Sequence, residues 1–222
     1  LNLYGGTALR IEDETLYNDG VVSISGDGSS IEGRVQNSAR VQIADAAVHF
    51  NGRLENNGTI QSENSTIRFG DLVVGPEGVV QAGAGDALII MGDFLNKSRA
   101  APLWRTEEAA LVFDGAGTHQ FALAAEDVGY SPQGGLGHFG WASLTALPGV
   151  EIVFVDGNLA NHGMALYVDA LYLEAAQIDP GNLVALPFSG DATIYYNPNL
   201  PENDYLQGLT YTFASGSGSL TA

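Results

Sequence analysis

Two ten-residue segments, GRVQNSARVQ at residues 33–42 and GRLENNGTIQ at residues 52–61, align without a gap, so that Gly33 falls on Gly52 at an offset of 19. The segment LYNDGVV at residues 16–22 fits the same frame one repeat earlier. Repetition at a fixed period indicates a repeat protein, in which each unit buries its apolar face by stacking on its neighbours.

The repeat continues beyond residue 61 with a looser period. An offset of about 20 leads from Leu54 to Val74 and then to Phe94. Asparagines also recur at one position of the repeat, and Pro76 interrupts this column. The frame returns at residues 159–163. We expect a second apolar column at the end of each preceding strand, formed by Phe50, Phe69, Phe113 and Phe154.

Apolar residues alternate within each repeat, and Asn, Asp and Gly separate the alternating segments. Alternation indicates short strands, and these polar residues and glycine favour turns. The sequence therefore predicts an all-β, single-domain parallel β-helix (β-solenoid) with coils of about 19–21 residues, right-handed as parallel crossovers usually are. A flat β-sandwich is the rival fold, but it does not require the same residues at a fixed offset.

We expect one domain over residues 1–222, in four parts. Regular coils occupy 1–99, an irregular coil with a loop insertion 100–147, and further coils 148–190, and 191–222 is a C-terminal cap or an assembly segment.

One column of the repeat holds asparagine. Stacked Asn side chains pair amide to carbonyl in other arrays of stacked strands. We therefore expect a structural ladder, and not a binding site, formed by Asn18, Asn37, Asn56, Asn96 and Asn161.

The composition excludes several classes of partner. With 26 acidic and 8 basic residues the formal net charge is -18, which repels nucleic acid and anionic lipid. Such acidity fits solubility outside the cell, or carboxylates that hold structural Ca²⁺ between coils or subunits. The absence of Cys excludes disulfides and thiolate sites.

No apolar run approaches the roughly 20 residues that a membrane span needs. A charged and apolar leader does not precede Leu1, so we expect the mature form of an exported protein.

Three regions are candidates for a contact surface. The turn-rich segment 131–141 follows Tyr130 and contains Phe139 and Trp141, which either pack it onto the coils or form a face for a glycan or a neighbouring subunit. An uncapped terminal coil would offer free backbone N–H and C=O groups at either end of the chain. The candidate binding or assembly residues are Tyr130, Phe139, Trp141, Leu3, Tyr4, Tyr205 and Tyr211.

The sequence contains no pattern typical of a catalytic centre. Polysaccharide-active β-helices gather several carboxylates on one face, whereas here acidic residues lie singly beside turn glycines, as at Asp19, Asp71, Asp93, Asp114 and Asp156. The four histidines lack the short spacing of zinc sites. We expect no enzyme activity, no catalytic residue, no metal ligand and no cofactor other than the Ca²⁺ considered above.

The C-terminal half resembles the repetitive β-helical region of bacterial secreted proteins sorted by the PEP-CTERM/exosortase system. The resemblance rests on residues 113–121 (FDGAGTHQF), 162–173 (HGMALYVDALYL), 194–198 (IYYNP) and 205–208 (YLQG). It implies export and a role at the bacterial surface or in the extracellular matrix. The sorting tag of that system, Pro-Glu-Pro before an apolar helix, does not follow in this sequence, so we expect either its removal by processing or a relative that lacks it.

These observations favour a secreted structural or surface protein, a matrix component or filament subunit that assembles head to tail with itself, or with other matrix components, through stacked coils. The alternative is an adhesin module that binds a glycan or a receptor. A polysaccharide lyase or hydrolase ranks below both.

Overall fold

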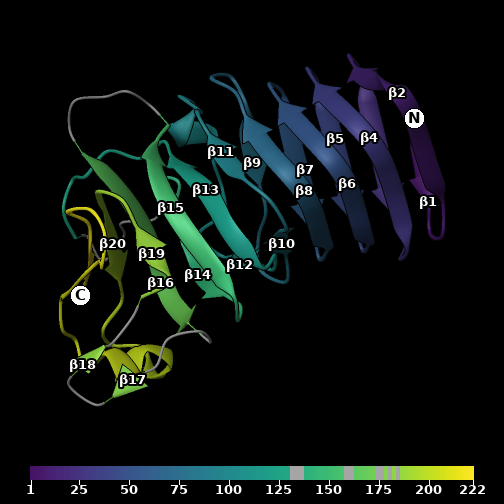
Figure 1. The fold of residues 1–222 in the computed structure, drawn as a ribbon. Helices are drawn as coiled ribbons and strands as arrows, with labels where there is room; N and C mark the ends of the chain where they lie inside the picture. The colour runs from purple at the N-terminus through teal and green to yellow at the C-terminus, as the bar shows by residue number, and fades with distance from the viewer. Residues whose placement is uncertain (131–137, 158–162, 174–177, 180–181, 184–185) are drawn as a thin grey trace.

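The protein is all-β, and its strands follow one another along a single stack from the N-terminus to the C-terminus (Figure 1). The computed structural model describes residues 1–130, 138–157, 163–173, 178–179, 182–183 and 186–222. Most neighbouring strands are parallel and lie one repeat apart in the sequence.

The first ladder is a five-stranded parallel sheet in the N-terminal half. Buried residues alternate with more exposed ones along β3, β5 and β7, in keeping with the period of two of a strand. Its members are β1 (Asn2–Tyr4), β3 (Val21–Ser25), β5 (Arg40–Ala44), β7 (Thr59–Glu63) and β9 (Val79–Gln81).

The second sheet begins with four long parallel strands and then divides into two ladders at the fourth. The long strands are β2 (Ala8–Asn18), β4 (Ser29–Asn37), β6 (Ala47–Asn56) and β8 (Thr66–Val74). One ladder continues through β10 (Ala87–Ile90), β12 (Ala110–Phe113), β14 (Trp141–Ala146), β16 (Met164–Leu173), β20 (Ala192–Tyr196) and β22 (Ser219–Thr221). The other continues through β11 (Phe94–Asn96), β13 (Gly117–Leu123), β15 (Val150–Asp156) and β19 (Phe188–Ser189).

The remaining elements are short. β21 (Tyr211–Thr212) pairs antiparallel with β22, and β17 (Ile178–Asp179) pairs antiparallel with β18 (Asn182–Leu183). Two 3-10 helices, η1 (Ala101–Leu103) and η2 (Pro201–Leu206), follow β11 and β20.

Glycines allow the long strands to stack closely where they bend. A Cβ atom on Gly52 would lie 2.2 Å from the carbonyl oxygen of Gly33, and one on Gly70 would lie 2.7 Å from that of Gly52. Contacts this short do not occur between real Cβ atoms and backbone, so these corners require glycine.

The register agrees with the offset of 19 at the start of the chain and departs from it later. Leu16 pairs with Val35, which pairs with Leu54, but Leu54 then pairs with Leu72. The expectation of Val74 beneath Leu54 is therefore wrong. The reason is a shortened corner: three residue steps separate Phe50 from Arg53, whereas two separate the paired residues Phe69 and Asp71.

Ala110 pairs with Ser143, well beyond the length of one regular coil, within the region where an irregular coil with a loop insertion is expected. Beyond residue 147 the repeats are longer than the expected 19–21 residues, since Met164 pairs with Ala192. Phe154 pairs with Phe121 and so does not belong to the column of Phe113, which pairs instead with Ala146. The core nevertheless stays continuous, since Phe94, Phe121 and Phe154 pack ring against ring with centroids 4.9 and 5.8 Å apart.

Candidate functional site

Strands β1 and β2 lie at the N-terminal edge of the two sheets. Within the described residues β1 pairs only with β3 and β2 only with β4. The Ser38 N–H donates to the Asn18 carbonyl at 2.9 Å, so Asn18 faces β4 and the backbone groups of Tyr17 face away from it. A further strand, from this chain or from another, would lie on this outer side and pair with such backbone groups.

Apolar side chains are exposed at the N-terminal edge. Tyr4 and Tyr17 are 66% and 67% exposed, and Leu1 and Val21 are exposed beside them. Leu3, by contrast, is buried, so it contributes to the core and not to the expected assembly surface. The outer side of β1 and β2 thus combines strand backbone that pairs on one side only among the described residues with exposed apolar side chains.

The core columns are only partly covered at this edge. Leu9 and Leu16 are half-buried, while Ile31 and Val35, with which they pair, are 1% and 2% exposed. The difference arises because Ile31 and Val35 have a paired strand on both sides. A further strand laid on β2 would complete the burial of both leucines.

The asparagine column forms a chain of hydrogen bonds over the first three repeats. Asn18 Nδ2 donates to Asn37 Oδ1 at 2.7 Å, and Asn37 Nδ2 donates to Asn56 Oδ1 at 2.6 Å. Asn56 Nδ2 then donates to the Val79 carbonyl, because Val74 occupies the next position of the column. The earlier expectation of Pro76 at that position is wrong, since Pro76 lies in the following turn.

Asn96 pairs with Val74 and is buried, but Val74 separates it from the three hydrogen-bonded asparagines. Its Oδ1 accepts from the Ser98 N–H at 3.0 Å. Asn161 lies outside the described residues.

The C-terminal end is covered. β21 lies antiparallel on β22, and Phe213 packs over Phe154 and Phe188 with centroids 5.9 and 5.7 Å away. Two of the expected assembly residues hold this cover in place: the hydroxyl of Tyr205 donates to Leu171 O at 3.0 Å and that of Tyr211 to Leu206 O at 3.1 Å. Both side chains are half-buried, so the interpretation of 191–222 as a cap fits their contacts better than an assembly surface does.

Asn203 fixes η2 within this C-terminal cover. Its side chain is 1% exposed, donates to Asp169 O and Asn197 O, and accepts from the Leu171 N–H at 2.9 Å. The sequence analysis missed this residue, because the run Asn197-Pro198-Asn199 around it reads as an ordinary turn.

Two of the three aromatic residues expected at a contact face are buried. Trp141 is 3% exposed and packs edge-on against Phe94, and Phe139 is 7% exposed and packs edge-on against Trp104 at 5.0 Å. Of the two alternatives considered for these residues, packing onto the coils agrees with this burial and a contact face does not: their apolar area fills the core where the first ladder ends. Tyr130 is 42% exposed, and residues 131–137 of the expected loop lie outside the described residues.

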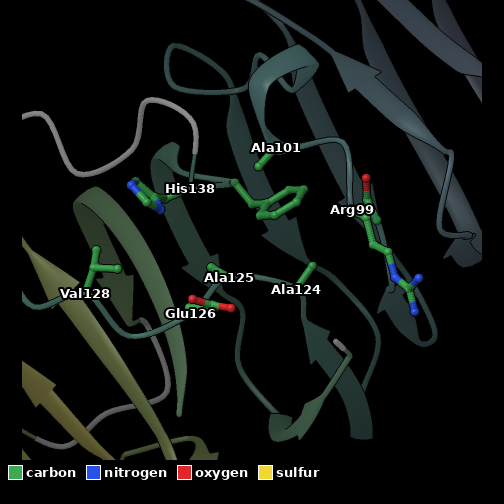
Figure 2. A pocket seen from close by; sticks show the side chains of 9 residues that line it. Arg99, Ala101, Ala124, Ala125, Glu126, Val128 and His138 are labelled. Carbon is green, nitrogen blue, oxygen red and sulfur yellow. The ribbon is translucent and has the colours of Figure 1, made fainter. Parts of the chain in front are cut away.

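A hollow of about 260 Å³ lies where the first ladder stops. That ladder ends in a single bridge between Gln81 and Arg105, and the segments beyond it are irregular. Figure 2 shows Glu126 beside Ala125, with His138 and Arg99 on opposite sides of the hollow. The lining residues are Ser98, Arg99, Ala101, Ala124, Ala125, Glu126, Val128, His138 and Phe139.

Hydrogen bonds fix the segments that line this hollow. Trp104 Nε1 donates to Thr106 Oγ1, and Thr106 Oγ1 donates to the Gly140 carbonyl at 2.5 Å. These bonds hold Gly140, directly after Phe139, whose φ of 58° lies in the left-handed region that bulky residues rarely adopt. Tyr167 donates its hydroxyl to Glu126 O at 3.2 Å and so holds the other wall.

A row of aromatic rings leads away from the hollow. His138 lies 5.7 Å from Tyr167, Tyr167 stacks on Tyr195 at 5.3 Å, and Tyr195 lies 6.5 Å from the exposed Tyr130. Burial and the hydrogen bond from the Tyr195 hydroxyl to Asp127 raise the pKa of Tyr195 to about 12. Burial also raises the pKa of Tyr167. Both phenols therefore stay protonated and act as hydrogen-bond donors at neutral pH.

The carboxylates considered for catalysis act within the stack. Asp71 Oδ1 accepts from the Asp93 N–H, Asp93 Oδ1 accepts from the Gln120 N–H, and Asp114 pairs with Arg68 at 2.7 Å. These bonds join one repeat to another, and the Arg68–Asp114 pair spans the intervening strand β10. Among the described residues no group of three or more His, Asp or Glu is placed to hold a metal ion.

The hollow could not be found from the repeat alone, because it forms where the repeat fails. One sequence signal does mark this half of the chain: residues 106–222 contain many acidic residues and no Lys or Arg. Neither of the two short helices in the described part has the length or apolar character needed to cross a bilayer. No family model, curated protein or solved structure matches the chain.

Proposed function

We propose that the chain is a right-handed parallel β-helix and serves as a structural subunit of an extracellular surface or matrix, joined to a second β-coil through its N-terminal edge. The observation that carries this proposal is that β2, an 11-residue strand, pairs only with β4 among the described residues and has apolar side chains exposed beside it. Support for the β-helix comes from successive parallel pairings of the same residue columns, such as Leu16, Val35 and Leu54.

The direction of the asparagine chain also supports coil addition at this edge. Each Asn side chain donates to the Asn of the next repeat toward the C-terminus. The first acceptor in this series of hydrogen bonds is therefore Asn18 Oδ1, which accepts from the nearby Gly20 N–H at 3.2 Å. An amide from a coil laid on β2 would donate to this oxygen as Asn18 donates to Asn37. A strand addition of this kind takes its affinity from backbone hydrogen bonds and its specificity from side-chain columns.

The two edges of the described stack differ. Among the described residues β21 and Phe213 lie over the C-terminal strands, whereas nothing lies on the outer side of β1 and β2. We therefore propose that a second β-coil joins at the N-terminal edge and not at the C-terminal one. A location at the bacterial surface follows from the resemblance to exosortase-sorted proteins and from the acidic, cysteine-free composition.

Sedimentation of the purified chain over a range of concentrations, with Ca²⁺ and with chelator, tests this function. We expect reversible association that is lost in the double variant Tyr4→Lys/Tyr17→Lys, because charge on an edge strand opposes pairing. Tyr172→Lys is the matched control, since Tyr172 is also exposed but lies on β16, away from the edge. A wild-type chain that remains monomeric at every concentration would contradict the proposal.

A further inference from the structure

We propose that the hollow between Glu126, His138 and Arg99 binds a neutral sugar residue, and that Tyr195 and Tyr130, the two tyrosines of the aromatic row that are not buried, contact the next residues of the same glycan. This site is independent of the N-terminal edge and of the assembly proposed for it.

The walls of the hollow combine the two surfaces that a sugar ring presents. Ala101, Ala124 and Ala125 leave room for an apolar ring face, and Phe139 adds an aromatic wall. Glu126 and His138 bring hydrogen-bonding groups to the same space, and Arg99 lies at its other side. An apolar cavity with a few convergent polar groups is the general form of a small-molecule site.

The size of the hollow favours a single ring. Its volume of about 260 Å³ lies just below the range of about 300–1,000 Å³ typical of sites for drug-sized ligands. A longer ligand must therefore leave the hollow, and the aromatic row gives it a path over Tyr195 to Tyr130.

Charge decides which sugars fit. Glu126 lies in the hollow, Asp127 accepts from Tyr195 beside it, and residues 106–222 contain no Lys or Arg. Among the described residues that line the hollow Arg99 is the only Lys or Arg, and the two carboxylates of Glu126 and Asp127 outweigh its charge, which disfavours an anionic sugar. The hydroxyls of a neutral sugar donate to a carboxylate. Arg99 and His138 then supply donors to ring and hydroxyl oxygens.

The backbone on both sides of the hollow is held in place before any ligand binds. The bonds from Thr106 to Gly140 and from Tyr167 to Glu126 fix the two walls, and Phe139 keeps a left-handed φ of 58° between them. Non-glycine residues in such conformations gather at ligand sites, where the surroundings hold them.

Calorimetric titration with neutral oligosaccharides of increasing length, from the monosaccharide upward and including gluco-, xylo- and manno-oligosaccharides, tests this site. Uronic-acid and glucosamine oligosaccharides of the same lengths provide the charged comparison. We expect binding of at least one neutral series, and an affinity at least about tenfold lower in Glu126→Ala and in His138→Ala, since each removes a hydrogen bond to the sugar. Glu108→Ala and His49→Ala are matched controls, because both side chains are exposed and lie outside the hollow.

Two further variants separate the hollow from the aromatic row. Ala125→Leu should block binding of every length by filling the hollow, while Tyr130→Ala should weaken the longer oligosaccharides and leave the monosaccharide unchanged. Melting temperatures of all variants identify any that fail to fold. The proposal is overturned if no neutral series binds, if only a charged series binds, or if a folded Glu126→Ala variant binds as the wild type does.

Discussion

Asn37 donates its side-chain N–H to the Oδ1 atom of Asn56, 2.6 Å away and 19 residues further along the chain. Asn37 also accepts from Asn18, and its side chain is only 1% exposed. One residue thus ties three successive repeats together inside the protein, where an unpaired amide would be costly.

Replacing Asn37 with Ala should therefore lower the free energy of unfolding by about 2–3 kcal/mol, because Asn56 loses a donor and Asn18 loses an acceptor. Denaturant unfolding measures this loss. Asn51→Ala is the control on an exposed position of β6 and should change stability by about 0.5 kcal/mol or less. Equal effects of the two substitutions would contradict the ladder.

Gly52→Ala should destabilise the protein by about 2 kcal/mol or more, because the new Cβ would lie 2.2 Å from Gly33 O and force the stacked corners apart. Gly83→Ala provides the comparison, since a Cβ there has nothing within 4 Å. In thermal unfolding the Gly52→Ala variant should melt at a lower temperature than the Gly83→Ala variant. A Gly52→Ala variant with the melting temperature of the wild type would mean that the repeats stack less closely than described.

Ser62→Val should raise the stability by about 1 kcal/mol, because the Ser62 hydroxyl is buried without a hydrogen-bond partner, in line with Ile43 of the neighbouring strand. Ser65→Val should have the opposite sign, because the Ser65 hydroxyl donates to Glu63 O and accepts from the Ala46 N–H. Denaturant unfolding of both variants checks the contrast, which a loss of stability in Ser62→Val would refute.

The C-terminal cover should loosen at alkaline pH. Burial raises the pKa of Tyr195 and Tyr196 from 10.0 to about 12, so their protonated forms stabilise the folded state. This contribution is complete below pH 10 and is lost as the pH rises through 12, because the unfolded chain releases its phenolic protons first. Unfolding free energies measured across this interval should fall, and a flat profile would contradict the assigned burial.

The fold class could be read from the sequence because the first repeats obey one period. Leu16, Val35 and Leu54 occupy equivalent positions in three strands. Each of them is followed by an Asn at the same spacing, so the asparagines repeat with the same period. Nothing in this pattern reveals the corner between Phe50 and Arg53, where one residue is lost from the next repeat, so the assignment of Val74 failed.

The candidate site was harder to predict. Aromatic residues in a turn-rich segment suit either a core or a contact face, and burial of Trp141 and Phe139 depends on the end of a ladder far away in the sequence. The sequence around Trp141 does not indicate where the first ladder ends. The exposure of Tyr130, by contrast, follows from its polar, glycine-rich neighbours in the sequence.

Cross-linking of paired cysteines tests the parallel stack of coils most directly, because the natural chain has no Cys. Gln42, Gln61 and Gln81 occupy one column of the first ladder, with Gln61 paired to both of the others. Neighbouring strands lie about 4.8 Å apart, within reach of a disulfide, whereas strands two steps apart are too distant. Oxidation should therefore cross-link Gln42→Cys/Gln61→Cys and Gln61→Cys/Gln81→Cys but leave Gln42→Cys/Gln81→Cys reduced, and failure of both neighbouring pairs would contradict the β-helix.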